Sequence, residues 1–271
     1  RIQKMEILNR TNAPFSNAVW NVIDETMSEF LSKKLSLRTL IDFKNNYSFD
    51  TDAVFTKRIK KISSEKGVTI STREPIKMVE IKKIFSVSNE TVDEIKRGIK
   101  DFKDDEFSSA ANEFATIENN MILEGLNEAG FQGIINHSSV KSLDANSTKD
   151  ILSCVAKSLG IFHNNFVDGD FKLVVSSATL TKLYTEFFYG ISLKTKLDDI
   201  LGQGNIVVNE DIGNNTAMII SQRGGDFEFC SGLDLSIGFE KVNKESIELF
   251  LIETCALRIL GPEAAVVFNL K

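Results

Sequence analysis

The chain has 271 residues, of which 42% are hydrophobic and 26% charged, so it has enough apolar residues for one or two domain cores. Its formal net charge of -6 disfavours a general nucleic-acid binder, because such proteins usually present a basic surface. No apolar run reaches the roughly 18 residues of a membrane-spanning helix, and the first residues lack the order of a signal peptide. We therefore expect a cytoplasmic globular protein with no membrane partner.

The residue types that usually bind metals are few. The three cysteines, Cys154, Cys230 and Cys255, are far apart in the sequence, which favours buried free thiols over a zinc or redox site. Neither His137 nor His163 lies three residues after a glutamate, so the Glu-x-x-His pair of bundle di-iron proteins is absent. We expect no metal and no cofactor.

An amphipathic helix is predicted to begin after Ser16. With Ser16 as N-cap, Phe15 and Trp20 occupy the two positions that pack together in a hydrophobic staple. Apolar residues then recur at helical spacing as far as Leu31, which predicts one buried stripe.

Residues 47–87 are rich in lysine and predict a projecting hairpin. Gly67 suits its turn, and Pro75 is best tolerated at a strand edge or a bulge. The segment has too few apolar residues for a core of its own, so its packing partner should lie elsewhere, on this chain or on another subunit. Nucleic acid is an unlikely partner for this basic segment, because it lacks interleaved aromatic residues for base stacking.

The strongest helix signal lies between residues 110 and 130. Ala110, Phe114, Ile117, Met121 and Ala129 share one predicted face, and Gly130 suits a left-handed C-terminal cap. A second helix is expected after Ser147 or Thr148, followed by a buried strand at 171–175. Residues 246–260 are too uniformly apolar for periodicity to separate a strand from a buried helix.

No convincing catalytic set is visible. Glu113, Glu118 and Glu124 share the long helix, but helical spacing turns Glu118 away from the other two and keeps those about three turns apart. We therefore expect solvated or interface carboxylates. The glycine motifs at 202–204 and 223–226 match neither a phosphate-binding loop nor a dinucleotide fingerprint, and we interpret both as turns.

Three sequence blocks are distinctive. The first covers residues 8–15 with Trp20 and 23–24, the second 38–42, and the third 223–227, 234–239, 249–254 and 262–264. In order and spacing these blocks resemble the encapsulin shell proteins, which are relatives of tailed-phage capsid proteins, over nearly the whole chain. The resemblance favours a strand at 246–260.

The resemblance implies an α+β protein with the fold of the HK97 phage major capsid protein: a peripheral domain, an axial domain and an extended hairpin loop. Its boundaries here would be 1–46 for the N-terminal helix and part of the peripheral domain, 47–87 for the hairpin loop, 88–132 for the part with the long spine helix, 133–220 for the axial domain, and 221–271 for the C-terminal strands of the peripheral domain.

The resemblance also implies two sites. Encapsulins bind a short C-terminal peptide of a cargo enzyme in a groove beside the N-terminal helix, with alternate side chains in apolar pockets. Carried over, Arg38 and Asp42 would orient the peptide, although Ile23 and Met27 are equally explained as core. The groove residues would be Ile23, Met27, Phe30, Arg38, Asp42, Leu233, Asp234, Leu235 and Ile237. The pore at a five-fold axis would be lined by Phe188, Tyr189, Gly190 and Ile191.

The expected function is therefore structural, with no catalytic residues. The chain would form a closed icosahedral shell of about 60 copies or a larger multiple. The enclosed enzyme would be a ferritin-like protein or a dye-decolourising peroxidase, for iron storage or defence against oxidative stress. The alternative within the class is a phage or prophage capsid protein, which the lack of a long scaffolding prefix disfavours. The competing class is a small hydrolase that uses the scattered carboxylates.

Overall fold

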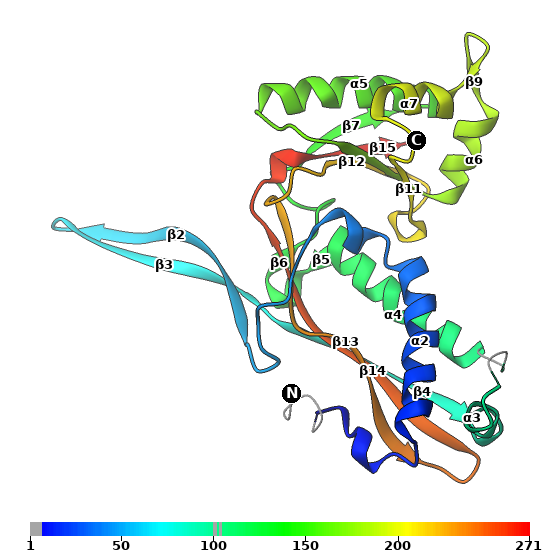
Figure 1. Cartoon of the computed structure of the whole chain (residues 1–271). Helices are drawn as coiled ribbons and strands as arrows, with labels where there is room; N and C mark the ends of the chain where they lie inside the picture. The colour runs from blue at the N-terminus through cyan, green and yellow to red at the C-terminus, as the bar shows by residue number, and fades with distance from the viewer. Residues whose placement is uncertain (1–6, 100–101, 103–104) are drawn as a thin grey trace.

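A computed structural model describes residues 7–99, 102 and 105–271 of the chain. Two sheet-based parts lie end to end, and a long hairpin projects to one side (Figure 1). We call them the four-stranded part, the five-stranded part and the hairpin. No helix among the described residues combines the length and apolar character needed to cross a membrane.

The four-stranded part consists of one sheet with two long helices packed on one face. The strand order is β1-β13-β14-β4, and only β1 and β13 run parallel. The strands are β1 (Asp42–Lys44), β4 (Val79–Ser88), β13 (Phe227–Val242) and β14 (Ser246–Ile259), and the helical segments are η1 (Arg10–Asn12), α2 (Asn17–Lys34), η2 (Leu37–Leu40), α3 (Asn89–Lys96) and α4 (Asp105–Leu123).

The five-stranded part has the strand order β11-β8-β12-β15-β7. Helix α5 packs against it, and a short hairpin, β9–β10, projects from its far end (Figure 1). Its elements are β7 (Lys141–Ala145), α5 (Thr148–Asn164), β8 (Phe171–Val175), α6 (Ser177–Thr185), β9 (Phe187–Phe188), β10 (Ile191–Ser192), α7 (Leu193–Leu201), β11 (Ile206–Val208), η4 (Glu210–Ile212), β12 (Thr216–Ser221), η5 (Pro262–Ala264) and β15 (Ala265–Leu270).

The start of α2 agrees with the sequence prediction. The Ser16 hydroxyl accepts a hydrogen bond from the Val19 N–H, and the Phe15 and Trp20 rings meet edge to face with centroids 5.2 Å apart. This N-cap and staple fix the direction in which the chain enters the helix. The apolar stripe of α2 then packs against α4.

The hairpin is shorter than the sequence analysis indicated. Its strands are β2 (Ala53–Glu65) and β3 (Val68–Lys77), joined by Lys66 and Gly67, both with positive φ as a two-residue hairpin turn requires. Residues 79–87, expected in the hairpin loop, instead belong to β4 and pair with β14. The cause is their apolar alternation, because Phe85 and Val87 enter the core beneath the helices.

The expected C-terminal boundary is also corrected. Residues 265–270 form β15 between β12 and β7 of the five-stranded part, and not a strand beside β13 and β14. Ala265, Val266, Val267 and Phe268 are all buried, and such an unbroken apolar run suits a central strand covered on both faces. Residues 246–259 form strand β14, as the resemblance indicated.

Helix α4 ends earlier than predicted. It stops at Leu123, Ile117 is exposed, and Gly130 instead follows the short helix η3 (Asn127–Ala129) with a φ of 82°. Beyond Leu123 the strands β5 (Gly125–Leu126) and β6 (Phe131–Gln132) pair, and the Ile135 N–H donates to the Leu123 carbonyl. The returning chain thus satisfies the end of the helix, which local periodicity could not reveal.

Gly133 should tolerate no side chain, because the returning chain passes close to the end of α4 there. A Cβ there would lie 2.3 Å from the Leu123 carbonyl oxygen and 2.4 Å from Glu124 backbone atoms, which cannot move aside easily. We expect Gly133→Ala to cost about 3 kcal/mol or more of unfolding free energy. Gly160→Ala is the control, because Gly160 lies on α5 with open space around it and should gain about 0.5–1 kcal/mol. Denaturant unfolding of both variants distinguishes the two effects, and equal stabilities would contradict this close approach.

Candidate functional site

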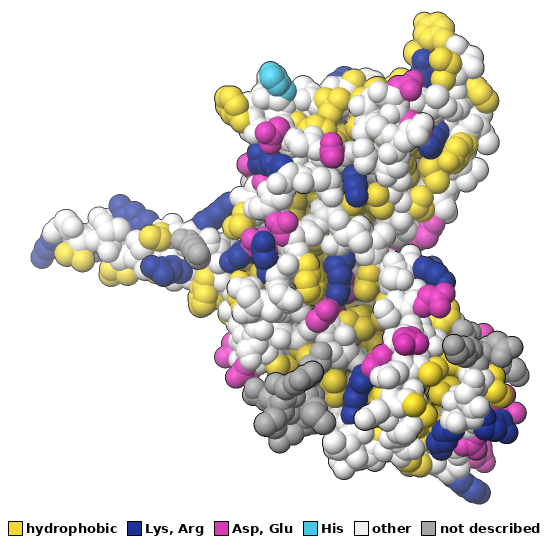
Figure 2. Space-filling view, viewed as in Figure 1, with side chains coloured by type: hydrophobic (Ala, Val, Ile, Leu, Met, Phe, Trp, Pro, Cys, Tyr) yellow, Lys and Arg dark blue, Asp and Glu magenta, His cyan; other side chains and the backbone are white. Residues whose placement is uncertain are grey.

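A groove of about 770 Å³ lies between α2 and β13. Most of its wall is aliphatic, with charged side chains at the rim and on the floor. Figure 2 shows exposed hydrophobic side chains between charged ones on the side of the molecule that carries α2. The lining residues are Leu8, Arg10, Asp24, Met27, Ser28, Leu31, Ser32, Leu35, Arg38, Thr39, Asp234, Leu235, Ser236 and Ile237.

The structure brings five of the nine predicted groove residues to this wall. They come from α2, η2 and β13, three elements that are far apart in the sequence. Only Leu235 among the aliphatic members is partly exposed, whereas Met27 and Ile237 are almost fully covered. The five residues are Met27, Arg38, Asp234, Leu235 and Ile237.

The other four predicted residues do not line the groove. Ile23 is 1% exposed within the core between α2 and α4, and Phe30 packs against that same core. Leu233 lies with Phe250 and Ile252 in a separate cluster, because the register of β13 shifts between Leu233 and Ser236. Asp42 accepts a hydrogen bond from the Gly225 N–H and thereby holds the turn before β13.

Sequence analysis missed the residues that close one end of the groove. The Arg10 guanidinium donates two hydrogen bonds to Asp24, at 2.8 and 2.6 Å, and its Nε donates to the Ile237 carbonyl at 2.8 Å. The same guanidinium lies 4.3 Å above the Trp20 ring. This bidentate pair connects the N-terminal segment to both walls. No sequence signal joins Arg10 to Ile237, because they are 227 positions apart.

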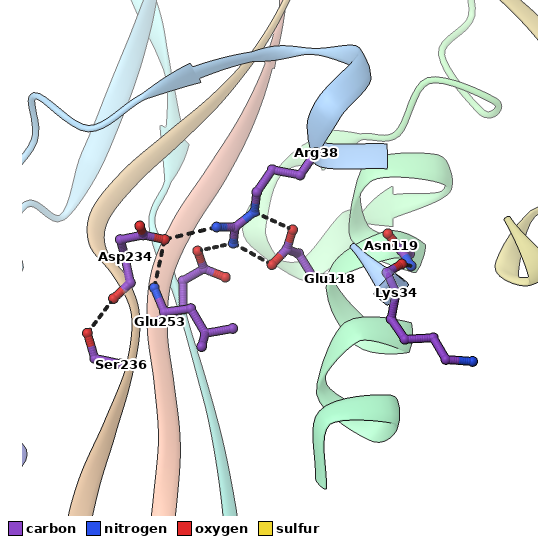
Figure 3. Close-up of polar contacts among 8 residues, drawn as sticks. Lys34, Arg38, Glu118, Asn119, Asp234, Ser236 and Glu253 are labelled. Atoms are coloured by element: carbon purple, nitrogen blue, oxygen red, sulfur yellow. Dashed lines mark hydrogen bonds and ion pairs between the residues drawn. The ribbon is translucent and has the colours of Figure 1, made fainter. Parts of the chain in front are cut away.

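An ion-pair cluster centred on Arg38 adjoins the groove, and Arg38 and Asp234 of this cluster line it (Figure 3). The Arg38 Nε and Nη2 donate to the two carboxylate oxygens of Glu118, at 3.0 and 2.6 Å. Nη2 also donates to Glu253 at 2.6 Å, and Nη1 donates to Asp234 at 2.9 Å. The donors of Arg38 are thus engaged within the protein, which favours a structural role beneath the groove over direct orientation of a peptide.

Burial dominates the electrostatics of this cluster. The side chains of Glu118 and Glu253 are 0% exposed, which corrects the expectation that Glu118 is solvated or at an interface. Burial opposes the charge on Arg38, yet the hydrogen bond to Glu118 and the surrounding carboxylates raise its pKa overall. Glu118 lies on the buried stripe of α4, and Glu253 lies inside the apolar strand β14. Because a buried carboxylate usually has a partner, these two positions in the sequence could have identified the pair.

The predicted pore residues lie together at the tip of the five-stranded part. Phe188 and Ile191 pair across β9 and β10, and Tyr189 and Gly190 form the turn with positive φ. Tyr189 is 89% exposed, and its ring meets that of Phe188 edge to face. Within the described residues, no three His, Cys, Asp or Glu side chains are grouped as metal ligands.

Comparisons with known proteins match this chain along nearly its full length. The family model described as "Encapsulating protein for peroxidase" matches residues 5–256. The chain belongs to the encapsulin shell protein family. A type 1 encapsulin shell protein of Brevibacterium linens is 31% identical over 98% of this chain and 100% of its own length. One from Rhodospirillum rubrum is 29% identical over 97% of this chain and 96% of its own.

Solved structures confirm the HK97-type α+β fold. A virus-like particle from Pyrococcus furiosus is similar with a TM-score of 0.67 and 19% identity, covering 92% of this chain and 98% of that one. The capsid protein of the myovirus phage XM1 is similar with a TM-score of 0.59 and 10% identity, covering 87% of this chain and 91% of that one. The encapsulin relatives are structural shell proteins, which confirms the expected non-enzymatic class and argues against a carboxylate-dependent hydrolase.

Removing Arg38 should destabilise the encapsulin fold itself. Arg38→Met leaves Glu118 and Glu253 buried without their cation, and we expect a loss of about 3–5 kcal/mol of unfolding free energy. Arg97→Met changes an exposed arginine after α3 and should stay within about 0.5 kcal/mol. Denaturant unfolding provides the measurement, and equal effects of the two substitutions would show that the cluster contributes little.

Proposed function

We propose that copies of this encapsulin chain assemble in the cytoplasm into a closed icosahedral shell around a cargo enzyme. The observation that carries the proposal is the family match, which extends over almost the full length of the chain and of its relatives. The capsid protein of phage XM1 shares the fold at 10% identity, whereas the Brevibacterium linens relative with 31% identity is an encapsulin shell protein. We therefore favour an encapsulin shell over a phage capsid. A reducing cytoplasm also suits the three free, buried thiols.

The hairpin supports assembly because the apolar residues beyond its base are exposed in the single chain. Ile59 is 68% exposed and Ile70 57% exposed. Ile59 pairs with Arg73 while Ile70 pairs with Ser63, so the two isoleucines lie on opposite faces of the ribbon. A two-stranded ribbon is only marginally stable alone, so we infer that neighbouring copies cover both faces.

Charges on both faces of the hairpin should prevent shell formation. Ile59→Asp combined with Ile70→Asp should leave the protomer folded, because both side chains are already exposed, but should place carboxylates in the contacts between copies. We expect small species in place of particles by size-exclusion chromatography and negative-stain electron microscopy. Ile59→Val with Ile70→Val is the control and should assemble. Normal particles from the aspartate variant would rule out burial of these two side chains in the shell.

The groove is suited to a short peptide from the cargo enzyme. Its aliphatic wall can accept alternate side chains of an extended segment, while the polar rim can pair with peptide groups. We propose Met27, Leu235 and Ile237 as wall residues, with Arg38 and Asp234 below them. Ferritin-like proteins and peroxidases are the proposed cargo classes, which would give the shell a role in iron storage or oxidative-stress defence.

Filling the groove should empty the shells without preventing assembly. Ser28 is exposed on α2 and lines the groove, so Ser28→Trp adds bulk there and does not disturb the core. Glu25→Trp is the control, on the same helix but away from the groove lining. We expect shells of Ser28→Trp purified from the native host to lack the co-purifying protein that mass spectrometry detects in the parent and in Glu25→Trp. Equal loading of all three would remove the groove assignment.

The β9–β10 turn is the proposed pore segment. Its two-residue turn exposes Tyr189 almost completely at the tip of the five-stranded part. Copies related by a five-fold axis would bring Phe188, Tyr189, Gly190 and Ile191 around one opening, where they would filter small solutes. No cofactor is needed for either role.

A further inference from the structure

Glu118 and Glu253 meet at a single nitrogen atom. The Arg38 Nη2 lies 2.6 Å from Glu118 Oε2 and 2.6 Å from Glu253 Oε1. The two carboxyl groups come from α4 and β14, and both side chains are 0% exposed. Figure 3 shows the two carboxyl groups on either side of this nitrogen. Two buried carboxyl groups therefore depend on one cation.

The charges around Arg38 do not balance if both glutamates are ionised. One guanidinium supplies one positive charge, against two buried carboxylates. Asp234 also contacts Arg38, but its side chain is 52% exposed, so water screens its charge. The second oxygen of Glu253, Oε2, is buried and has no hydrogen-bond partner among the described residues. An ionised carboxylate in that position costs enough free energy that such a group takes up a proton instead.

Among the residues that the structure describes, the neighbouring elements add no further cation. On β14, Cys255 shares a face with Glu253, and burial raises the pKa of its thiol. On β4, Ile81 is the residue that pairs with Glu253. The charged neighbours of Ile81, Glu80 and Lys82, point to the opposite face of the sheet. Phe43 of β1 and Phe229 of β13 lie about 5 Å from the guanidinium.

We propose that Glu118 and Glu253 share one bound proton at neutral pH, and that its release to solvent at alkaline pH weakens the seam between α4 and β14. With that proton the three groups carry no net charge, since one carboxylate balances Arg38. The protonated carboxyl is also a donor, so it can hydrogen-bond to the other carboxylate. Paired carboxyl groups at one site retain a proton for this reason, and the proton belongs to the pair.

The pH dependence of folding stability follows from the direction in which the pKa of Glu253 is shifted. Burial and then the charge of Glu118 raise the pKa of Glu253 well above its usual 4.5. The folded protein therefore holds a proton that the unfolded chain has lost. The stabilisation by this proton is complete at pH values below the pKa that the glutamate has in the unfolded chain. It is lost as the pH rises through the pKa of the glutamate pair in the folded protein. Replacing either glutamate with glutamine removes this dependence, because the remaining carboxylate is balanced by Arg38.

Infrared spectroscopy of the purified protein tests the proposal, because a protonated carboxyl has a carbonyl stretch distinct from that of a carboxylate. We expect this band at neutral pH and its loss on raising the pH. Glu118→Gln and Glu253→Gln should each lack it, whereas Glu113→Gln, which alters an exposed glutamate on the same helix, should retain it. The wild-type spectrum is decisive even if a variant does not fold. Absence of the band at neutral pH, or its persistence in both buried variants, would overturn the proposal.

A second measurement distinguishes a shared proton from a purely structural role of Glu118 and Glu253. The unfolding midpoint of the wild type should fall between neutral and alkaline pH by more than that of Glu253→Gln, and Glu113→Gln should follow the wild type. Parallel pH profiles for all three proteins would contradict a shared proton.

Discussion

The guanidinium of Arg38 joins four segments at one point. It joins η2 to α4 through Glu118, to β14 through Glu253, and to β13 through Asp234. The helical layer and the sheet of the four-stranded part are therefore joined by this buried cation as well as by apolar packing. Because buried ion pairs require good geometry to offset desolvation, this cluster fixes the position of α4 over the sheet more narrowly than aliphatic contacts would.

Helix α4 transmits that position to the five-stranded part. Directly after Glu118, the Asn119 side chain donates to the Lys34 carbonyl and, at 2.7 Å, to Asp211 of η4. Asp211 also accepts from Thr116. Helix α4 thus contacts the Arg38 cluster through Glu118 and the short helix η4 through Thr116 and Asn119. These polar contacts of defined direction add to the hydrophobic core that the two parts share, which suits a shell subunit that repeats the same shape in every copy.

The sequence predicted local features well and long-range contacts poorly. The staple at Phe15 and Trp20, the turn at Gly67 and the strand at 246–259 follow from short-range patterns, the last with help from family resemblance. The early end of α4 and the placement of β15 depend on segments that return from elsewhere in the chain. A local pattern identifies the buried side of an element, but not the segment that covers it.

The candidate groove shows the same limit more sharply. Met27 and Ile237 were expected there and line it, whereas Leu233 does not, because the register shift in β13 changes which residues face α2. Asp42 lies only four residues from Arg38 yet binds the turn at Gly225. Family resemblance therefore pointed to elements that do line this groove, but which residues face it depends on the bulge and the hydrogen bonds that only the folded chain displays.

Strand β14 links the groove to the hairpin. Glu253 accepts a hydrogen bond from Arg38 beside the groove, and five residues later Arg258 pairs with Glu228 and donates to the Phe55 carbonyl at the base of the hairpin. Arg58 of the hairpin donates back to the Leu260 carbonyl. The base of the hairpin is thus clamped to the strand, while Ile59 and Ile70 farther out are exposed. A base held by these hydrogen bonds fixes the direction of the hairpin, and the exposed outer part suits the contacts between copies that we propose for the shell.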